Sequence, residues 1–63
     1  MSEDIKDLMR TEVMNGGVEM EEALVHFELA DDTTYQMFYL GQIMGIAERV
    51  KSTAMSIAKK ISS

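Results

Sequence analysis

Apolar side chains near the start of the chain recur at intervals of three and four residues, which is the period of an amphipathic helix. Four of them fall on one side of such a helix: Ile5, Leu8, Met9 and Val13. Ser2 can accept a hydrogen bond from the early backbone amides, and acidic residues follow it in the first turn. Residues 15–17 are Asn-Gly-Gly, which tolerate the positive φ angles that often end a helix. We therefore predict a short first helix that stops there.

Residues 18–32 fit two patterns. As a helix, they place four apolar side chains on one face: Met20, Ala23, Leu24 and Phe27. As a strand, Val25, Phe27 and Leu29 alternate with polar residues, and residues 33–35 would begin the return strand of a β-hairpin. Residues 21–24 favour a helix by propensity, and the turn at residues 30–32 lacks the glycine that tight hairpin turns prefer. A second short helix is the prediction, with part of a β-hairpin as the alternative.

A longer apolar stripe runs through the C-terminal half, where no proline interrupts it. Its members recur at helical spacing: Tyr35, Tyr39, Ile43, Ile46, Val50, Ile57 and Ile61. Residues 31–34 are Asp-Asp-Thr-Thr, and each is a good N-cap for a helix that begins here. The pattern predicts one long C-terminal helix.

Together these patterns predict an all-α chain with a short helix, a second short helix and one long C-terminal helix, forming a single small domain over residues 1–63. The predicted core consists of Ile5, Leu8, Leu24, Phe27, Tyr39, Ile43, Ile46, Val50 and Ile57. A chain of this length buries only ~60% of its unfolded surface, and it has no cysteine for a disulfide. We therefore expect the helices to pack in a homo-oligomer, a dimer or larger.

Two glycines, Gly41 and Gly45, interrupt the most apolar part of the long helix, although glycine inside a helix costs ~1 kcal/mol relative to alanine. They lie nearly opposite the isoleucine stripe. Glycines four apart let a second helix approach closely; the alternative is that they relax the helix or make room for side chains of the same chain. Methionine adapts its shape at binding surfaces, so two nearby methionines are included. The predicted oligomer or partner contact consists of Met37, Phe38, Gly41, Met44, Gly45 and Ser52.

Charge is divided unevenly along the chain, whose net charge is −5. Residues 1–32 carry ten acidic and two basic side chains, whereas residues 33–63 carry one acidic and four basic ones. The two halves attract each other, within one chain or between antiparallel chains, unless both are simply solvated faces. An acidic surface is expected at Glu19, Glu22, Asp31 and Asp32. Direct nucleic-acid binding is not expected, because phosphate contacts need basic side chains.

No residue pattern points to catalysis or to a cofactor. His26, the only histidine, lies one helical turn after Glu22, but two ligands make an incomplete metal site, so no metal site is predicted. The glycines at residues 16–17 are followed by acidic residues rather than a lysine, unlike a phosphate-binding loop. The longest nearly apolar run, residues 37–47, is too short to span a membrane, and the charged residues 1–12 do not resemble a signal peptide. We expect a soluble, cytoplasmic protein that is not an enzyme.

These features favour a small acidic protein–protein interaction module: an adaptor, assembly factor or inhibitor that presents a helical surface. Its expected partners are itself and another protein, and contact with a membrane is not expected. One alternative is a structural subunit that assembles only with itself. Another is an acidic mimic of nucleic acid, in which Glu19, Glu22, Asp31 and Asp32 block a DNA- or RNA-binding protein.

Overall fold

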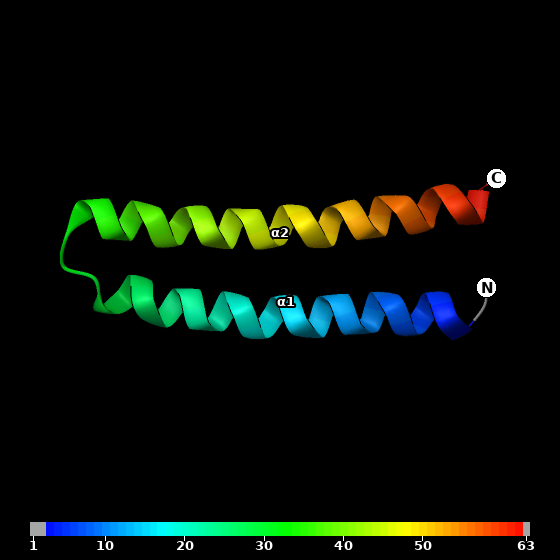
Figure 1. Ribbon diagram of the computed structural model, residues 1–63, viewed down its shortest axis with the longest axis horizontal. Coiled ribbons are helices and arrows are strands. Elements are labelled where there is room, and N and C mark those ends of the chain that lie inside the picture. The colour runs from blue at the N-terminus through cyan, green and yellow to red at the C-terminus, as the bar shows by residue number, and fades with distance from the viewer. Residues whose placement is uncertain (1–2, 63) are drawn as a thin grey trace.

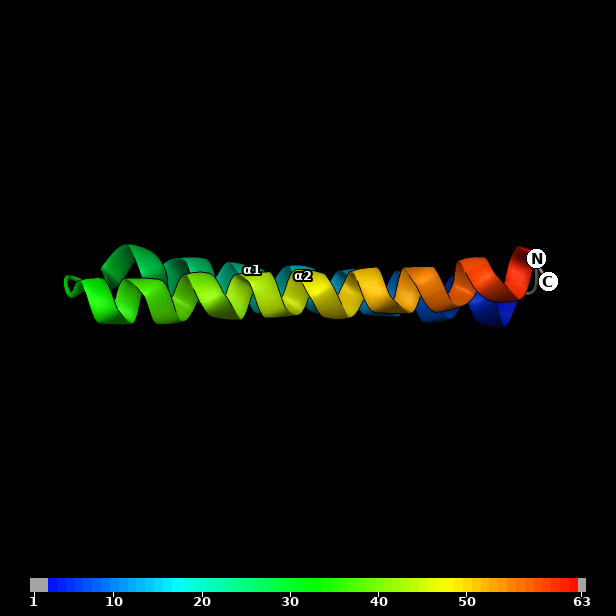
Figure 2. The same ribbon diagram turned by 90° about the horizontal axis from the view of Figure 1, so that it is seen from above.

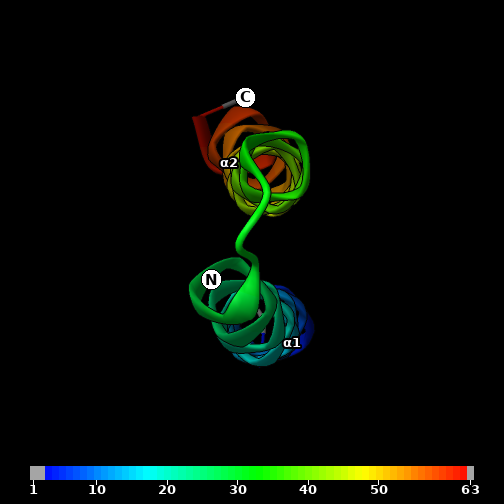
Figure 3. The same ribbon diagram turned by 90° about the vertical axis from the view of Figure 1, so that its left-hand side faces the viewer.

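The computed structural model describes residues 3–62 and consists of two long antiparallel helices joined by a short turn (Figure 1). Helix α1 spans Glu3–Leu29, and helix α2 spans Thr33–Ser62. The two helix axes are slightly inclined to each other (Figure 2). Seen along its length, the described part of the chain consists of two helices side by side (Figure 3). The Cα atoms extend over 47 × 17 × 8 Å. The predicted all-helical class is confirmed, but the prediction of two short helices before a long one is wrong.

Helix α1 continues through residues 15–17, where the sequence predicted a stop. No described glycine has a positive φ, so this run is ordinary helix. The reason lies on α2: a Cβ added at Gly16 would lie 2.8 Å from Cγ2 of Val50. Glycine therefore allows the two helices to approach closely here. Packing along the whole length of α1 then offsets the poor helix propensity of the two glycines, since tertiary contacts supply most helical stability.

Two further expectations concern the ends of the first segments. The predicted cap at Ser2 lies outside the described residues. The β-hairpin alternative for residues 25–40 is excluded, because that region contains the end of α1, the turn and the beginning of α2. Helix propensity at residues 21–24 therefore prevails over the alternation of apolar residues that follows them.

One side of each helix faces the other helix, and we call these positions the seam. They recur at intervals of three and four residues, as helix packing requires. On α1 they include Ile5, Met9, Glu12, Gly16, Met20, Ala23 and Phe27, and on α2 they include Gln36, Tyr39, Ile43, Ile46, Val50, Thr53 and Ile57. Among the described residues, the buried apolar side chains are Ala23 and Ile57, 3% and 7% exposed. A layer of two helices has only one seam, so most seam side chains remain open to solvent on one side.

Seven of the predicted core residues lie on the seam: Ile5, Phe27, Tyr39, Ile43, Ile46, Val50 and Ile57. Leu8 and Leu24 do not, and they are 48% and 46% exposed. The seam passes instead through Met9 and Ala23, and adjacent residues of a helix point about 100° apart. The prediction of Leu8 and Leu24 as core residues is therefore corrected: both lie on the flanks of α1.

The turn at residues 30–32 is held by local hydrogen bonds. Asp32 is the N-cap of α2, because its Oδ1 accepts a hydrogen bond from the backbone N–H of Thr34 at 2.6 Å and its carbonyl accepts one from Gln36 at 3.0 Å. The Gln36 side chain donates back to the carbonyl of Ala30 at 2.9 Å. Of the four predicted N-cap candidates, the structure selects Asp32. The turn brings the two ends of the chain to the same end of the molecule (Figure 1).

Candidate functional site

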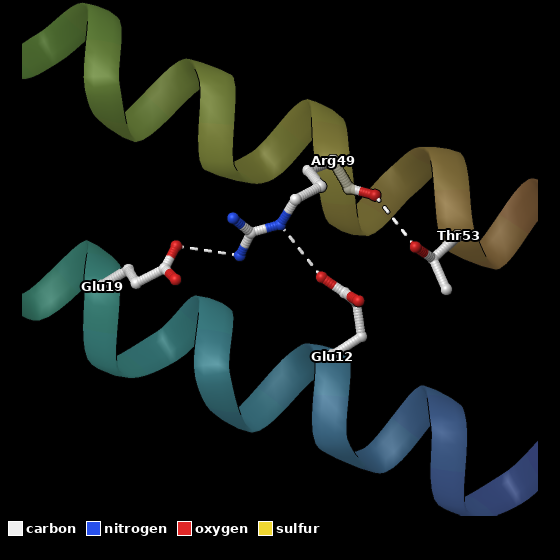
Figure 4. Close-up of polar contacts among 4 residues, drawn as sticks. All are labelled: Glu12, Glu19, Arg49 and Thr53. Carbon is white, nitrogen blue, oxygen red and sulfur yellow. Dashed lines mark hydrogen bonds and ion pairs between the residues drawn. The ribbon is translucent and has the colours of Figure 1, made fainter.

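One face of the hairpin is organised by Arg49, which reaches from α2 across the seam to two acids of α1 (Figure 4). Its Nε donates to Oε1 of Glu12 at 3.0 Å, and its Nη2 donates to Oε2 of Glu19 at 2.8 Å. The hydrogen bonds with Glu19 and Glu12 raise the pKa of Arg49 above its ordinary value. At Arg49, the acidic and basic halves of the chain attract each other within one molecule. We call this side of the hairpin the polar face.

Towards the turn, the polar face continues as an open groove of about 570 Å³. The ring of His26 stacks on that of Tyr39 with centroids 5.2 Å apart, and Phe38 meets Tyr39 edge-on at 5.3 Å. Glu22 and Gly45 also line this groove. Within the described residues, no group of three or more His, Asp or Glu side chains could hold a metal ion. The exposed His26 ring packs on the ring of Tyr39.

The four residues predicted as an acidic surface are all exposed, but the fold does not bring all four together. Glu19 pairs with Arg49, and Glu22 lines the groove beside it. Asp31 and Asp32 lie at the turn, where the carboxylate of Asp32 caps α2. Two of the four carboxylates are thus already engaged within the chain. This arrangement gives little support to a row of charges that imitates a nucleic-acid backbone.

The opposite side of the hairpin is a second surface, which we call the apolar face. Two open grooves run along it and meet at Val13, one of about 520 Å³ near the termini and one of about 410 Å³ at the middle. The first is lined by Ile5, Lys6, Met9, Arg10, Val13, Met14 and Ile57, and the second by Val13, Gly16, Gly17, Met20, Ala47, Val50 and Lys51. Among the residues whose side chains the structure describes, none that lines either groove is acidic. Sequence reasoning missed this face.

A signal for the apolar face is present in the sequence. Val13, Gly17, Met20 and Leu24 recur at intervals of four, three and four residues, one position away from the polar series that contains Glu12 and Glu19. Adjacent residues point about 100° apart, so the two series extend from the seam to its opposite sides, with Glu12 and Met20 at the two edges of the seam. The seam itself is marked on α1 by small residues such as Gly16 and Ala23, which carry little apolar signal.

The predicted oligomer or partner contact lies on the sides of α2 that are turned away from the seam. All six of its residues are exposed: Met37, Phe38, Gly41, Met44, Gly45 and Ser52. Met37, Phe38 and Met44 are 60%, 57% and 60% exposed. Nothing lies within 4 Å of a Cβ added at Gly41 or Gly45, so these glycines do not make room for a side chain of the same chain. We call this surface the outer side of α2.

Exposed large apolar side chains occur on both helices, from Leu8 and Val13 on α1 to Met55 and Ile61 on α2. Within residues 3–62, no helical stretch is both long and apolar enough to cross a membrane. Exposed apolar surface of this extent is typical of a site that contacts another molecule. Comparison of the chain with protein-family models, with curated protein sequences and with solved structures finds no significant match.

Proposed function

We propose that this chain is a small acidic protein–protein interaction module, an adaptor, assembly factor or inhibitor, that associates with itself and presents a helical surface to another protein. The observation that carries the proposal is the distribution of apolar side chains. Thirteen large ones are exposed among the described residues, whereas the buried apolar ones are Ala23 and Ile57. A folded chain that leaves so much apolar area in water gains free energy when a partner covers it.

The outer side of α2 is the surface that we assign to the other protein. Met37, Phe38 and Met44 project beside Gly41 and Gly45, where the helix backbone is bare. A partner helix laid along the glycines would contact the backbone and cover these three side chains. Full burial of one such side chain contributes about 1.5–3 kcal/mol relative to leaving it exposed. Large apolar anchors of this kind carry most of the binding energy at protein interfaces.

Charge next to this surface adds a preference for a basic partner. Gly45 and Phe38 line the same groove as Glu19 and Glu22, so acidic side chains border the apolar anchors on one flank. Charges at the rim of an interface chiefly raise the association rate and select the partner, rather than adding affinity. The partner expected here has an apolar helix flanked by lysine or arginine.

A photo-crosslinking amino acid at Met44 tests this assignment in cells that produce the protein. The same amino acid at Thr11, which is exposed on α1, is the control. We expect Met44 to form a covalent adduct with a different protein and Thr11 to form none. The Phe38→Asp substitution should abolish the Met44 adduct. Adducts that form only at Thr11 would contradict the assignment.

A structural subunit is the second candidate function. It is favoured by exposed apolar side chains on the outer sides of both helices, such as Val18 and Val25 on α1 and Met44 and Met55 on α2. Contacts at two different surfaces can propagate from copy to copy without closing. Sedimentation at several concentrations separates the candidates: growth without limit supports the structural subunit, and a discrete small oligomer supports the interaction module.

A further inference from the structure

We infer that two copies of this chain pair through their apolar faces in opposite directions, so that the turn of each hairpin lies over the termini of the other. The product is an antiparallel four-helix bundle. This inference rests on the self-association proposed above, and it adds the face, the orientation and the position of the two-fold axis.

The exposed area of the chain indicates how much surface the second copy covers. The chain exposes 4886 Å². A monomeric protein of its mass, 7.1 kDa, exposes about 4,100 Å². The excess of about 800 Å² matches the area that each partner buries in a stable interface of standard size. Because the hairpin is a single layer, a second layer against one face covers this area on both chains at once.

The apolar face is the side of the hairpin best suited to that second layer. Among the described residues, its two grooves are lined by apolar residues and glycine apart from Lys6, Arg10 and Lys51. The polar face instead carries the Arg49 ion pairs, whose burial would remove charged groups from water. Gly17 is exposed on the apolar face, and nothing lies within 4 Å of a Cβ added there. The backbone at Gly17 is therefore open to a helix from outside the hairpin.

The position of the two-fold axis follows from two small residues. Gly17 of α1 and Ala47 of α2 line the same groove at the middle of the apolar face. An axis that lies across the hairpin over these two residues pairs α1 with α1 of the other copy and α2 with α2 of the other copy, each in opposite directions. Small residues at the crossing points allow the closest approach of the helices.

Charge favours the antiparallel orientation. Lys6 lies eleven residues before Gly17, and Glu28 lies eleven residues after it. A two-fold axis at Gly17 therefore places Lys6 of each copy over Glu28 of the other. In the parallel arrangement, the two Lys6 side chains would lie at the same end, as would the acidic turns that carry Asp31 and Asp32. Like charges brought together oppose association, and opposite charges favour it.

Side-chain size on α2 fits the same orientation. Leu40 lies seven residues before Ala47, and Ala54 lies seven residues after it. Residues seven apart share one side of a helix, so the antiparallel pair sets the leucine of one copy against the alanine of the other. Large side chains placed against small ones fill the space between helices without overpacking.

Cysteine cross-linking tests the inference, because the natural chain contains no cysteine. Variants Lys6→Cys and Glu28→Cys are mixed and oxidised, and sedimentation equilibrium of the unmodified chain gives its mass. We expect a dimer, rapid disulfides between the two variants in the mixture, and little cross-linking of Lys6→Cys with itself. A dimer in which Lys6→Cys cross-links with itself overturns the orientation. Cross-linking only through Ser52→Cys on the outer side of α2 overturns the face. In either of these two outcomes the proposed self-association still stands. A chain that is monomeric at every concentration overturns both the self-association and the pairing inferred here.

A matched pair of substitutions provides a second test. Val13 lies on the apolar face and is 51% exposed, and Val18 lies on the outer side of α1 and is 57% exposed. Val13→Glu should weaken dimerisation at least tenfold, because the interface would then take a carboxylate out of water in place of an apolar side chain. Val18→Glu introduces the same charge and should leave the dimer intact. Circular dichroism confirms that both variants remain helical. Equal weakening by both variants contradicts the proposed interface.

Discussion

Gly16 packs directly against Val50 of the other helix. A Cβ added at Gly16 would lie 2.8 Å from Cγ2 of Val50 and 3.5 Å from Cγ2 of Ile46, whereas a Cβ added at any other described glycine would have no such neighbour within 4 Å. The sequence suggested that a close helix approach occurs at Gly41 and Gly45, with another chain as the neighbour. Within the hairpin, that role belongs to Gly16. The methyl group of Val50 cannot easily move away, because β-branched side chains are restricted at χ1 in a helix.

The first prediction is that Gly16→Ala destabilises the hairpin. Overpacking costs about 1–3 kcal/mol, and the gain in helix propensity returns up to ~1 kcal/mol. We expect a net loss of about 1 kcal/mol, which lowers the melting temperature of a domain this small by about 4–8 °C. Gly41→Ala is the control, because its Cβ meets nothing and only the propensity gain remains. In a Val50→Ala background the loss at Gly16 should shrink; a loss of unchanged size would show that Val50 is not its cause.

The second prediction concerns the N-cap of α2. Asp32→Ala removes the acceptor for the backbone N–H of Thr34 and should cost about 0.5–2 kcal/mol in urea unfolding. Asp31→Ala removes the same charge one residue earlier, from a side chain that does not cap the helix. We expect Asp31→Ala to be nearly neutral. Equal effects of the two substitutions would mean that charge at the turn, and not capping, determines the stability.

The third prediction tests the seam with two isoleucines on the same helix. Ile57 is 7% exposed, and Ile61, one turn later, is 55% exposed. Ile57→Val removes one buried methylene and should cost about 0.5–1.5 kcal/mol. Ile61→Val should stay within about 0.5 kcal/mol of the unmodified chain. A larger loss at Ile61 would place it in a contact that the hairpin alone does not provide.

The fourth prediction addresses the ion pairs across the seam. Arg49→Met keeps much of the apolar stem but removes the guanidinium that joins Glu12 and Glu19. The melting temperature should fall slightly at low salt, and the difference should disappear near 1 M salt, where the Debye length is about 3 Å. Lys59→Met removes an exposed charge from the last turn of the same helix and should produce a smaller salt-dependent difference. A deficit that persists at high salt would instead indicate lost packing of the arginine stem.

Much of the helical structure could be predicted from local sequence. The stripe from Tyr35 to Ile61 lies on a helix, because its period is long and regular and no proline interrupts it. The continuation of α1 through residues 15–17 could not be predicted in this way. Helix-ending signals are local, whereas the reason for Gly16 is a valine more than thirty residues away in the sequence. A glycine that admits a neighbouring helix and a glycine that ends its own helix look alike until the neighbour is known.

The surfaces were only partly predictable, because a surface formed by both helices depends on how the helices pair. The six residues of the outer side of α2 are exposed as a contact surface requires, and their use by another chain stays a prediction. The apolar face escaped prediction because it contains one series from each helix, and neither series alone is strongly apolar. Val13 and Gly17 can be recognised as part of an apolar surface only once Ala47 and Val50 are known to line the same groove. Which side of α1 is the seam and which is the flank depends on that pairing.

The position of both chain ends at the same end of the hairpin determines how the molecule responds to a pulling force (Figure 1). A force applied to the two termini acts across the helix pair and opens it at Ile5 and Ile57 first. The contacts then separate one turn at a time towards the turn at residues 30–32, so that only a few side chains bear the load at any moment. A partner that draws the termini apart can therefore unzip the hairpin stepwise, whereas a partner that grips the turn and one terminus has to shear the whole seam at once.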